Sequence, residues 1–355
     1  MKKIVILGGG YGGFTVAKEL SESKIPADAE IILLDRSPFL GLKTEYYALA
    51  AGTVAESEIR VPFHFHDRIS TKYGEIAEIN LELNTVAMHS GERIAYDYAV
   101  ISLGCVDNYH GIEGAQEHTL SLQTFSSVRK AYQQINDVKP YGTVSIVGGG
   151  LSGVELASEL RYSRPDLNVR IIDHGPTVLS MFPKKLSDYV HDWFVAHDVE
   201  LCNNISINRV EKGALYHAGK PFATDATVWT AGITPSPLVQ QLNVPKDKLG
   251  RILLNEHHQI AQFPNVFVVG DCASAAFSPS AQLAEAQGKQ VAEVICAIWD
   301  KREPRLGKIK LKGVLGSLGK KSGFGLLGKD DIIVTGWTPK LLKSGVLWMS
   351  KRNFA

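Results

Sequence analysis

The chain has 355 residues, which exceeds the usual size of one domain and predicts two domains with a small appendage. Apolar residues make up 45% and charged residues 21%, a composition that excludes a disordered or fibrous chain and is typical of a soluble α/β protein. The net charge of +1 conceals a basic tail, because residues 301–355 hold 13 Lys and Arg against 3 Asp and Glu.

The first predicted element is a buried parallel strand, the apolar run at residues 4–7. Gly8, Gly10 and Gly13 follow it at once, ahead of a helical pattern over residues 14–20. Strand, glycine turn and helix together form a dinucleotide-binding fingerprint. Its first glycine turns the chain, its second admits a pyrophosphate, and its third lets helix and strand pack closely. The helix N-terminus then faces the phosphate charge.

The next predicted strand, residues 30–34, ends at Asp35, which lies 27 residues after Gly8. A carboxylate at this position accepts hydrogen bonds from an adenosine ribose. Because a single glycine triplet can also be a tight turn without a ligand, this copy alone is weak evidence.

The whole pattern recurs about 140 residues later. A predicted strand at 144–147 precedes Gly148, Gly150 and Gly153, and Asp173 follows Gly148 by 25 residues. Two complete copies argue against ligand-free turns, and they predict one tightly held and one exchanging dinucleotide.

The residues after Asp173 indicate which nicotinamide cofactor binds. His174 and Gly175 follow, and no Arg or Lys stands there to neutralise a 2′-phosphate. The second fingerprint therefore predicts NADH rather than NADPH.

A third segment, residues 265–271, is a predicted buried strand that closes with Gly270 and Asp271. It resembles the late motif of the FAD/NAD-linked reductases, which implies that Asp271 bonds the ribityl or phosphate region of a flavin. Residues 100–104 and 228–232 resemble the two crossover segments of that family, although each alone reads as an ordinary strand ending in glycine.

Cysteine usage separates the branches of this superfamily. The segment at 36–47, where disulfide reductases carry redox cysteines, contains none, which implies an acceptor other than a protein disulfide. The four cysteines of the chain include no C-x-x-C pair and favour a reducing, cytoplasmic location; they are Cys105, Cys202, Cys272 and Cys296. Cys105 and Cys272 lie beside family motifs, but small buried cysteines are the commoner case.

Residues 42–52 and 60–63 resemble the corresponding region of type II NADH:quinone oxidoreductases, and the resemblance extends along nearly the whole chain. Further matches are 153–156, 280–284 and 312–319. The resemblance implies an α/β fold with two Rossmann-like domains. The expected boundaries are 1–110 with 255–305 for a discontinuous FAD domain, 111–254 for an inserted NAD(H) domain, and 306–355 for a basic C-terminal segment.

The resemblance implies FAD at the first fingerprint and NADH at the second. The residues expected around FAD are Gly8, Gly10, Tyr11, Gly12, Gly13, Asp35, Arg36, Lys43, Thr44, Gly104, Gly270, Asp271, Ala281 and Gln282. Those expected around NADH are Gly148, Gly150, Leu151, Ser152, Gly153, Glu155, Asp173 and Gly232. Hydride transfer between the cofactors requires no side-chain acid or base.

Glu155 and Gln282 are the candidate catalytic residues. Glu155 matches a family glutamate near the meeting point of nicotinamide and acceptor, where it would orient the carboxamide or pass protons; its alternative role is to complement a helix N-terminus. Gln282 belongs to the quinone-site signature Ala-Gln-x-Ala-x-Gln, whose last position is Ala286 here. A quinone carbonyl would lose one partner by that change, and Gln282 would form the site wall unless it is an ordinary helix-face residue.

The tail also contains a predicted helix at 338–354, shorter than the membrane-binding end of the family. One face gathers Leu341, Leu342, Val346, Trp348 and Met349, and the opposite face gathers Lys340, Lys343, Ser350 and Lys351. This helix would lie in a lipid headgroup layer or pack on its own domain or a twin subunit. No run of about 18 apolar residues predicts a membrane-spanning helix.

Three functions remain open at this point. The first is a peripheral NADH:quinone oxidoreductase on the cytoplasmic face of a membrane, with menaquinone or ubiquinone as acceptor. The second is a soluble NADH-linked flavin reductase with another acceptor, and the third is a non-catalytic flavoprotein sensor. A homodimer fits each of them. Nucleic-acid binding has little support because no recognition module accompanies the basic tail, and no histidine cluster has metal-ligand spacing.

Overall fold

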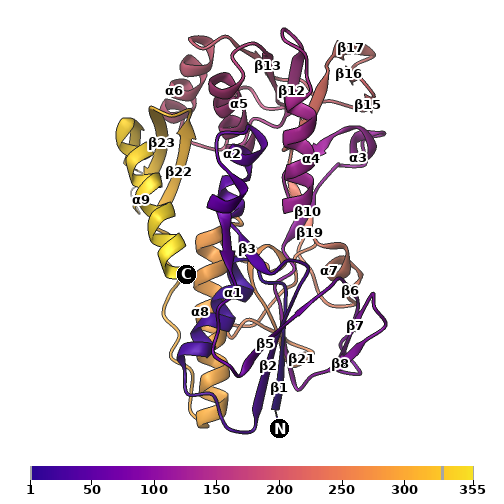
Figure 1. Ribbon diagram of the computed structural model, residues 1–355, viewed down its shortest axis with the longest axis vertical. Helices are drawn as coiled ribbons and strands as arrows, with labels where there is room; N and C mark the ends of the chain where they lie inside the picture. Colours follow the sequence, from indigo (N-terminus) through magenta and orange to yellow (C-terminus); the bar gives the residue numbers. More distant parts are fainter. Residues whose placement is uncertain (1, 329–331, 355) are drawn as a thin grey trace.

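The computed structural model describes residues 2–328 and 332–354. These residues form two α/β lobes, one above the other in Figure 1, and a smaller C-terminal unit beside the upper lobe. The expected fold class is confirmed.

The first lobe, at the bottom of Figure 1, is built on a six-stranded sheet of order β20-β21-β9-β1-β2-β5, parallel except for β20 against β21. Its strands are β1 (Lys2–Leu7), β2 (Ala29–Asp35), β5 (Ile69–Tyr73), β9 (Tyr98–Ile101), β20 (Gln259–Ile260) and β21 (Phe263–Val268). Helices α1 (Tyr11–Glu22) and α8 (Ala281–Asp300) pack together on one face of the sheet. The small sheet of β6 (Ile76–Asn80), β7 (Thr85–Met88) and β8 (Arg93–Ala95) covers the other face. Burial on both faces explains the uninterrupted apolar runs of β1 and β2.

The second lobe has an all-parallel sheet of order β11-β18-β12-β13-β14. Its strands are β11 (Leu120–Ser121), β12 (Thr143–Val147), β13 (Asn168–Ile172), β14 (Val199–Cys202) and β18 (Ala226–Trp229). Helices α4 (Phe125–Asn136), α5 (Leu151–Ser163) and α6 (Lys184–Val195) cover one face. The other face carries α3 (Ala115–His118) and the antiparallel sheet of β15 (Arg209–Glu211), β16 (Ala214–His217) and β17 (Lys220–Ala223).

The chain passes between the lobes along a two-stranded antiparallel ribbon. It leaves the first lobe through β10 (Cys105–Asp107), which pairs with the returning β19 (Ile233–Pro235) ahead of α7 (Pro237–Gln241). The second lobe is therefore inserted into the first, in agreement with the expected fold class.

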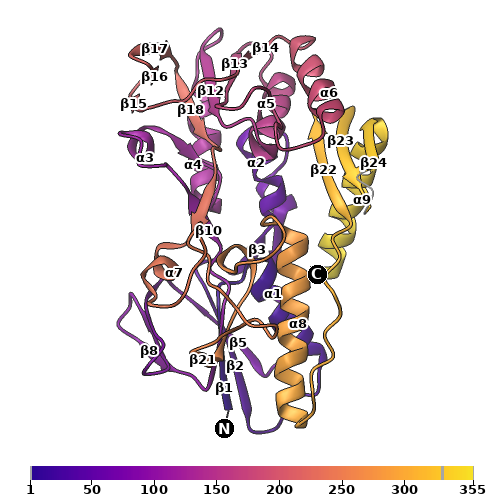
Figure 2. The same ribbon diagram turned by 180° about the vertical axis from the view of Figure 1, so that it is seen from behind.

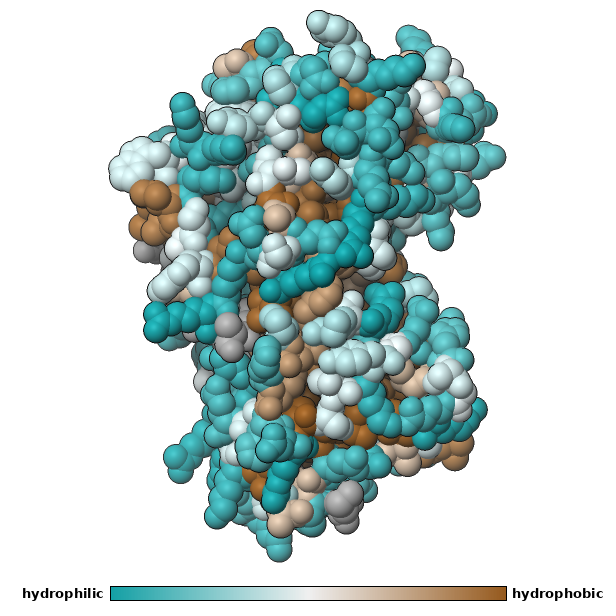
Figure 3. Space-filling model, in the orientation of Figure 1, coloured by the Kyte–Doolittle hydropathy of each residue, from teal (hydrophilic) through white to brown (hydrophobic). Residues whose placement is uncertain are grey.

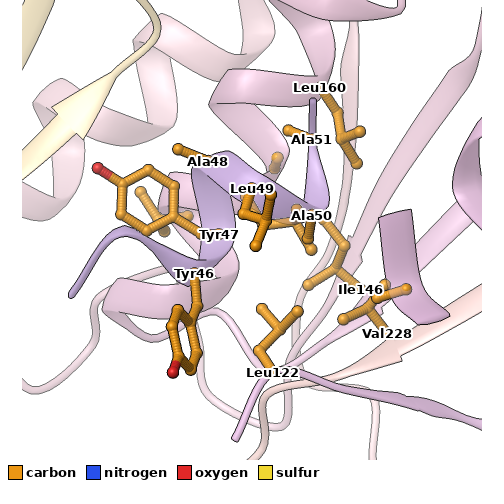
Figure 4. Close-up of a cluster of buried hydrophobic side chains, with 14 of the residues drawn as sticks. Tyr46, Tyr47, Ala48, Leu49, Ala50, Ala51, Leu122, Ile146, Leu160 and Val228 are labelled. Carbon is orange, nitrogen blue, oxygen red and sulfur yellow. The ribbon is translucent and has the colours of Figure 1, made fainter. Parts of the chain in front are cut away.

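One segment of the first lobe packs inside the second. Between β3 (Phe39–Gly41) and β4 (Arg60–Pro62) lie the short helices η1 (Lys43–Glu45), α2 (Tyr46–Ala50) and η2 (Glu56–Ile59). Figure 4 shows α2 among Leu122, Ile146, Leu160 and Val228 of the second lobe. Side chains of the first lobe thus form part of the hydrophobic core of the second.

The C-terminal unit is a three-stranded antiparallel sheet with one helix. Its elements are β22 (Gly313–Leu318), β23 (Ser322–Leu327), β24 (Ile332–Gly336) and α9 (Trp337–Phe354), and they lie against α5 and α6 (Figure 2). The helix was predicted, but the sheet was not, because glycines interrupt its strands and usually weaken a strand pattern. Across the described ranges, every helix falls short of the length and apolar character that crossing a bilayer requires.

Candidate functional site

The first glycine turn has the geometry of a phosphate cradle. Gly8 adopts a φ of +95°, and a Cβ on Gly13 would overlap the Gly8 carbonyl oxygen. A Cβ on Gly10 would meet no described atom within 4 Å, so the space over the N-terminus of α1 is open. The Gly9 N–H donates to Asp35 Oδ2 at 2.6 Å, and the Ser37 N–H donates to Asp35 Oδ1 at 2.7 Å.

The second glycine turn repeats this geometry. Gly148 has a φ of +111°, a Cβ on Gly153 would overlap the Gly148 carbonyl oxygen, and the space beside Gly150 is open among the described atoms. The Gly149 N–H donates to Asp173 Oδ2 at 2.5 Å, and the Gly175 N–H donates to Oδ1 at 2.6 Å.

A hydroxyl group from the neighbouring crossover strand supports each turn. Ser102 Oγ accepts a hydrogen bond from the Gly13 N–H at 2.8 Å. Thr230 Oγ1 lies 2.9 Å from the carbonyl oxygen of Gly148, to which it donates. Neither residue was among the predicted site residues, although both stand two positions before a crossover glycine.

The two cradles fit two dinucleotides. Each offers an open helix N-terminus for a diphosphate and an acidic side chain at the end of the second strand for a ribose. Burial raises the pKa of Asp35, and the hydrogen bonds from Ser37 and Gly9 act in the opposite direction by favouring the carboxylate. Each Asp35 oxygen keeps acceptor capacity for a ribose hydroxyl.

The structure brings several predicted FAD residues together at the carboxyl ends of the first sheet. Lys43 Nζ lies 3.9 Å from Asp271 Oδ2 and 3.1 Å from Cys105 Sγ. The Tyr11 hydroxyl lies 3.2 Å from Thr44 Oγ1. Arg36 is the exception, because its side chain is exposed and lies 4.0 Å from Glu75 at the sheet edge.

Cys105 borders this group but is not a reactive thiolate. Burial raises the pKa of the Cys105 thiol to about 12, so the group is neutral at physiological pH. Because the thiolate is the nucleophile in disulfide chemistry, this agrees with an acceptor other than a protein disulfide.

The remaining predicted residues lie in the first turns of helices and in the crossover segments. Gly12 lies in the first turn of α1, Leu151 and Ser152 begin α5, and Ala281 begins α8. Gly104, Gly232 and Gly270 all have positive φ, of +65°, +117° and +73°. Ser280 caps α8, because its hydroxyl accepts the Leu283 N–H at 3.2 Å.

Glu155 is 7% exposed and joins three parts of the molecule. Its Oε1 accepts the Ser317 N–H of β22 at 2.9 Å and a hydrogen bond from Lys343 of α9. Lys343 Nζ also donates to the Tyr47 hydroxyl at 2.6 Å and lies 3.8 Å from Glu45 Oε1. The predicted site residue Glu155 is therefore one member of a buried charged cluster.

The protonation of this cluster follows from its charges. Burial, the largest single influence, would lower the pKa of Lys343, but Glu155, Tyr47 and Glu45 together outweigh it and the net shift is upward. Burial raises the pKa of Glu45, which Lys343 counteracts. Glu45 was not among the predicted site residues, and Lys343 was predicted on a polar helix face with no indication that this face points inward.

The side chains of Gln282 and Gln287 both form hydrogen bonds with backbone groups. Gln282 donates from Nε2 to the Gly313 carbonyl oxygen and accepts the Lys312 N–H at Oε1, each at 3.0 Å. Gln287, one position beyond Ala286, is buried and accepts the Gly270 N–H at 2.8 Å. Gln282 therefore orders the entry to the C-terminal unit, and Gln287 fixes the turn that carries Asp271.

Comparisons with known proteins agree with this geometry. The family model described as pyridine nucleotide-disulphide oxidoreductase matches residues 2–290. The chain is 48% identical to the NADH dehydrogenase-like protein YutJ of Bacillus subtilis, with 99% of each chain covered. It is 25% identical to the type II NADH:quinone oxidoreductase of Staphylococcus aureus, covering 92% of this chain and 90% of that one. The solved structure of NDH2 from Plasmodium falciparum in complex with NADH has the same fold, with a TM-score of 0.84 at 16% identity over 99% of this chain and 96% of that one.

Proposed function

The chain belongs to the pyridine nucleotide-disulphide oxidoreductase family and is an FAD-dependent NADH oxidoreductase, and on that premise we propose that it passes the electrons of NADH to a quinone. The chemistry that FAD supplies when bound is acceptance of a hydride and release of electrons to a second acceptor. The observation that carries the proposal is the pair of equivalent cradles, each of which lies beside the crossover segment that leads into the β10–β19 ribbon.

The residues of the chain bind and orient the two cofactors. Asp35 and Asp173 fix the ribose ends, and the turns at Gly8 and Gly148 present open helix N-termini to the diphosphates. Asp173 is followed by His174 and Gly175, which supports NADH as the nicotinamide cofactor.

In the proposed site, Glu155 and Lys343 form an ion pair where the lobes and the C-terminal unit meet. Lys343 keeps its proton because its pKa is raised by Glu155. Glu155 would therefore orient polar groups of nicotinamide or acceptor, with Lys343 as its permanent counter-charge.

Two sets of observations bear on the identity of the electron acceptor. The name of the S. aureus relative and the absence of cysteine at 36–47 support a quinone. Ala286 and the engaged carboxamide of Gln282 favour the second candidate, a non-quinone acceptor, because they leave fewer polar partners for a quinone carbonyl. Gln282 would then shape the site wall through its hydrogen bond to the backbone of Lys312, in the segment between α8 and β22.

Steady-state oxidation of NADH and NADPH with a menaquinone analogue and with a soluble acceptor tests the proposal. We expect faster oxidation of NADH than of NADPH, and reduction of the quinone at a rate comparable to that of the soluble acceptor. Turnover with the soluble acceptor alone would refute the quinone and favour the second candidate.

We also propose that α9 attaches the protein to the cytoplasmic face of a membrane. Lys340 and Lys343 point inward. Six large apolar side chains of α9 are between 42% and 66% exposed: Trp337, Leu341, Leu342, Val346, Trp348 and Met349. Figure 3 shows apolar side chains at the left edge of the view, over the C-terminal unit. An outward apolar face on a basic tail suits the headgroup layer of a bilayer.

A further inference from the structure

The segment from Phe39 to Pro62, here termed the clasp, extends from the first lobe into the second and returns (Figures 1 and 4). Its base is closed, because β3 pairs antiparallel with β4 and the two strands lie side by side. Its middle is α2, whose side chains are buried in the core of the second lobe. The clasp therefore joins the lobes at a place separate from the β10–β19 ribbon.

An ion pair fixes the returning arm of the clasp to the second lobe. Arg129 of α4 donates from Nε to Glu56 Oε1 and from Nη2 to Glu56 Oε2, each at 2.5 Å. This two-point contact defines the orientation of both groups as well as their distance. Glu56 also accepts a hydrogen bond from Arg60 of β4, so one carboxylate ties α4 to the first lobe.

Aromatic rings from both lobes pack against Arg60, the second arginine bound to Glu56. The guanidinium carbon of Arg60 lies 4.7 Å from the ring centroids of both Phe39 and Phe125. Phe39 belongs to the first lobe and Phe125 begins α4 of the second, and their rings are 5.1 Å apart at 72°. Cation–π contacts of this kind hold a guanidinium in a defined plane.

We propose that Glu56 is a positioning residue for hydride transfer, because its carboxylate fixes α4 against β4 and thereby sets the angle between the two cofactor-binding lobes. The proposal rests on NADH oxidation by the bound flavin and is independent of the final acceptor. Donor and acceptor of the hydride belong to different lobes, and a misplacement of about 1 Å can lower such a rate about a hundredfold. The five-residue helix α2 holds the lobes together, and Glu56 limits rotation about it.

The test compares the FAD-loaded wild type with Glu56→Gln in anaerobic stopped-flow reduction by NADH. We expect the limiting rate of flavin absorbance loss to fall about tenfold, with the apparent Kd for NADH within about twofold of wild type. The isotope effect with NADH deuterated at the transferred position should persist or increase. Asp188→Asn is the matched control, because it breaks the Lys184–Asp188 pair within the single helix α6; it should leave rate and isotope effect unchanged.

Two further variants keep the test decisive if Glu56→Gln folds poorly. Arg129→Lys retains the charge but loses the two-point contact, and its rate should lie between those of wild type and Glu56→Gln. Glu56→Asp keeps the carboxylate to which both Arg129 and Arg60 bond, and its rate should also exceed that of Glu56→Gln.

The outcomes separate the role of Glu56 from the activity itself. If Glu56→Gln lowers the unfolding midpoint but keeps the wild-type rate and isotope effect, the pair is only structural and the proposal is wrong. If NADH fails to bleach the flavin of the wild type, the activity assignment fails and the role of Glu56 fails with it.

Discussion

At the scale of single residues, the same arrangement of a glycine turn and an aspartate occurs twice, with nearly the same hydrogen-bond distances. Asp35 and Asp173 each accept two backbone N–H groups, one of them from the glycine turn. The equivalence allows a matched pair of substitutions, because Gly10 and Gly150 both have ordinary negative φ and open space at the missing Cβ.

Gly10→Ala and Gly150→Ala should separate the two cofactors. Each new methyl group fits the protein but occupies space that a diphosphate requires. We expect Gly10→Ala to lower the FAD content of the purified protein, and Gly150→Ala to raise the KM for NADH about tenfold with normal FAD content. Flavin absorbance and steady-state kinetics measure both. Loss of FAD in Gly150→Ala would contradict the assignment of the turns.

Lys343→Met tests the buried charged cluster. Lys343 is 14% exposed in its side chain, and its removal leaves Glu155 and Glu45 without their shared cation. We expect the free energy of unfolding to fall by about 3–5 kcal/mol, and Glu155→Gln in the same protein to recover part of it. Denaturant unfolding measures both variants, and additive losses would contradict a paired role.

The pH dependence of this stabilisation has a definite sign. Since folding raises the pKa of Lys343, its contribution is complete below the ordinary lysine pKa of about 10.4 and is lost only as the pH rises through the higher folded pKa. The effect of Lys343→Met on stability should therefore be constant from pH 6 to about pH 9.

Residue-level prediction from sequence succeeded where partners are close in the chain or fixed by the fingerprint. The glycines and Asp35 carry a short-range signal. Lys343 and Glu155 are 188 residues apart, and no local pattern indicates that they meet. Ser102 and Gln287 were missed for the same reason, because each bonds backbone that only the folded sheet brings near.

At the scale of elements, α2 determines how the lobes behave together. Leu49 lies in the core of the second lobe although its segment belongs to the first (Figure 4). We expect a single cooperative unfolding transition of the whole protein in calorimetry, and Leu49→Ala should destabilise it by about 2–5 kcal/mol. Two separate transitions, one per lobe, would show that α2 does not couple them.

Variants of helix α9 distinguish membrane attachment from self-association, because its exposed apolar side chains could serve either. Leu341→Gln with Trp348→Gln changes two exposed side chains and should abolish flotation of the protein with lipid vesicles. Met181→Gln changes an even more exposed apolar side chain in the second lobe; it serves as the control and should float normally. Failure of the wild type to float, together with a dimeric mass in solution that the α9 variant loses, would favour a subunit interface.

The strands and helices with strong periodicity were predictable, and the C-terminal sheet was not. Apolar runs in β1 and β12 reflect burial on both faces. In β22 and β23, glycines at 316 and 323 leave room for Phe324 and for the backbone of α9, so packing by other elements replaces the usual strand pattern.

At the scale of the whole molecule, the sequence predicted two dinucleotide lobes with the second inserted into the first. Their mutual orientation was beyond prediction, because it depends on the clasp and on the β10–β19 ribbon, which involve residues from both lobes. The C-terminal unit joins the lobes through Glu155 and Lys343. The molecule therefore presents two cofactor cradles to one common junction.

The central claim is that these cradles hold a flavin and a nicotinamide close enough for a hydride to pass. Anaerobic titration of the FAD-loaded protein with NADH, followed by the visible flavin absorbance, tests it most directly. We expect complete bleaching at one equivalent of NADH and little bleaching by NADPH at the same concentration. A protein that binds no FAD, or whose flavin colour persists in excess NADH, would contradict it.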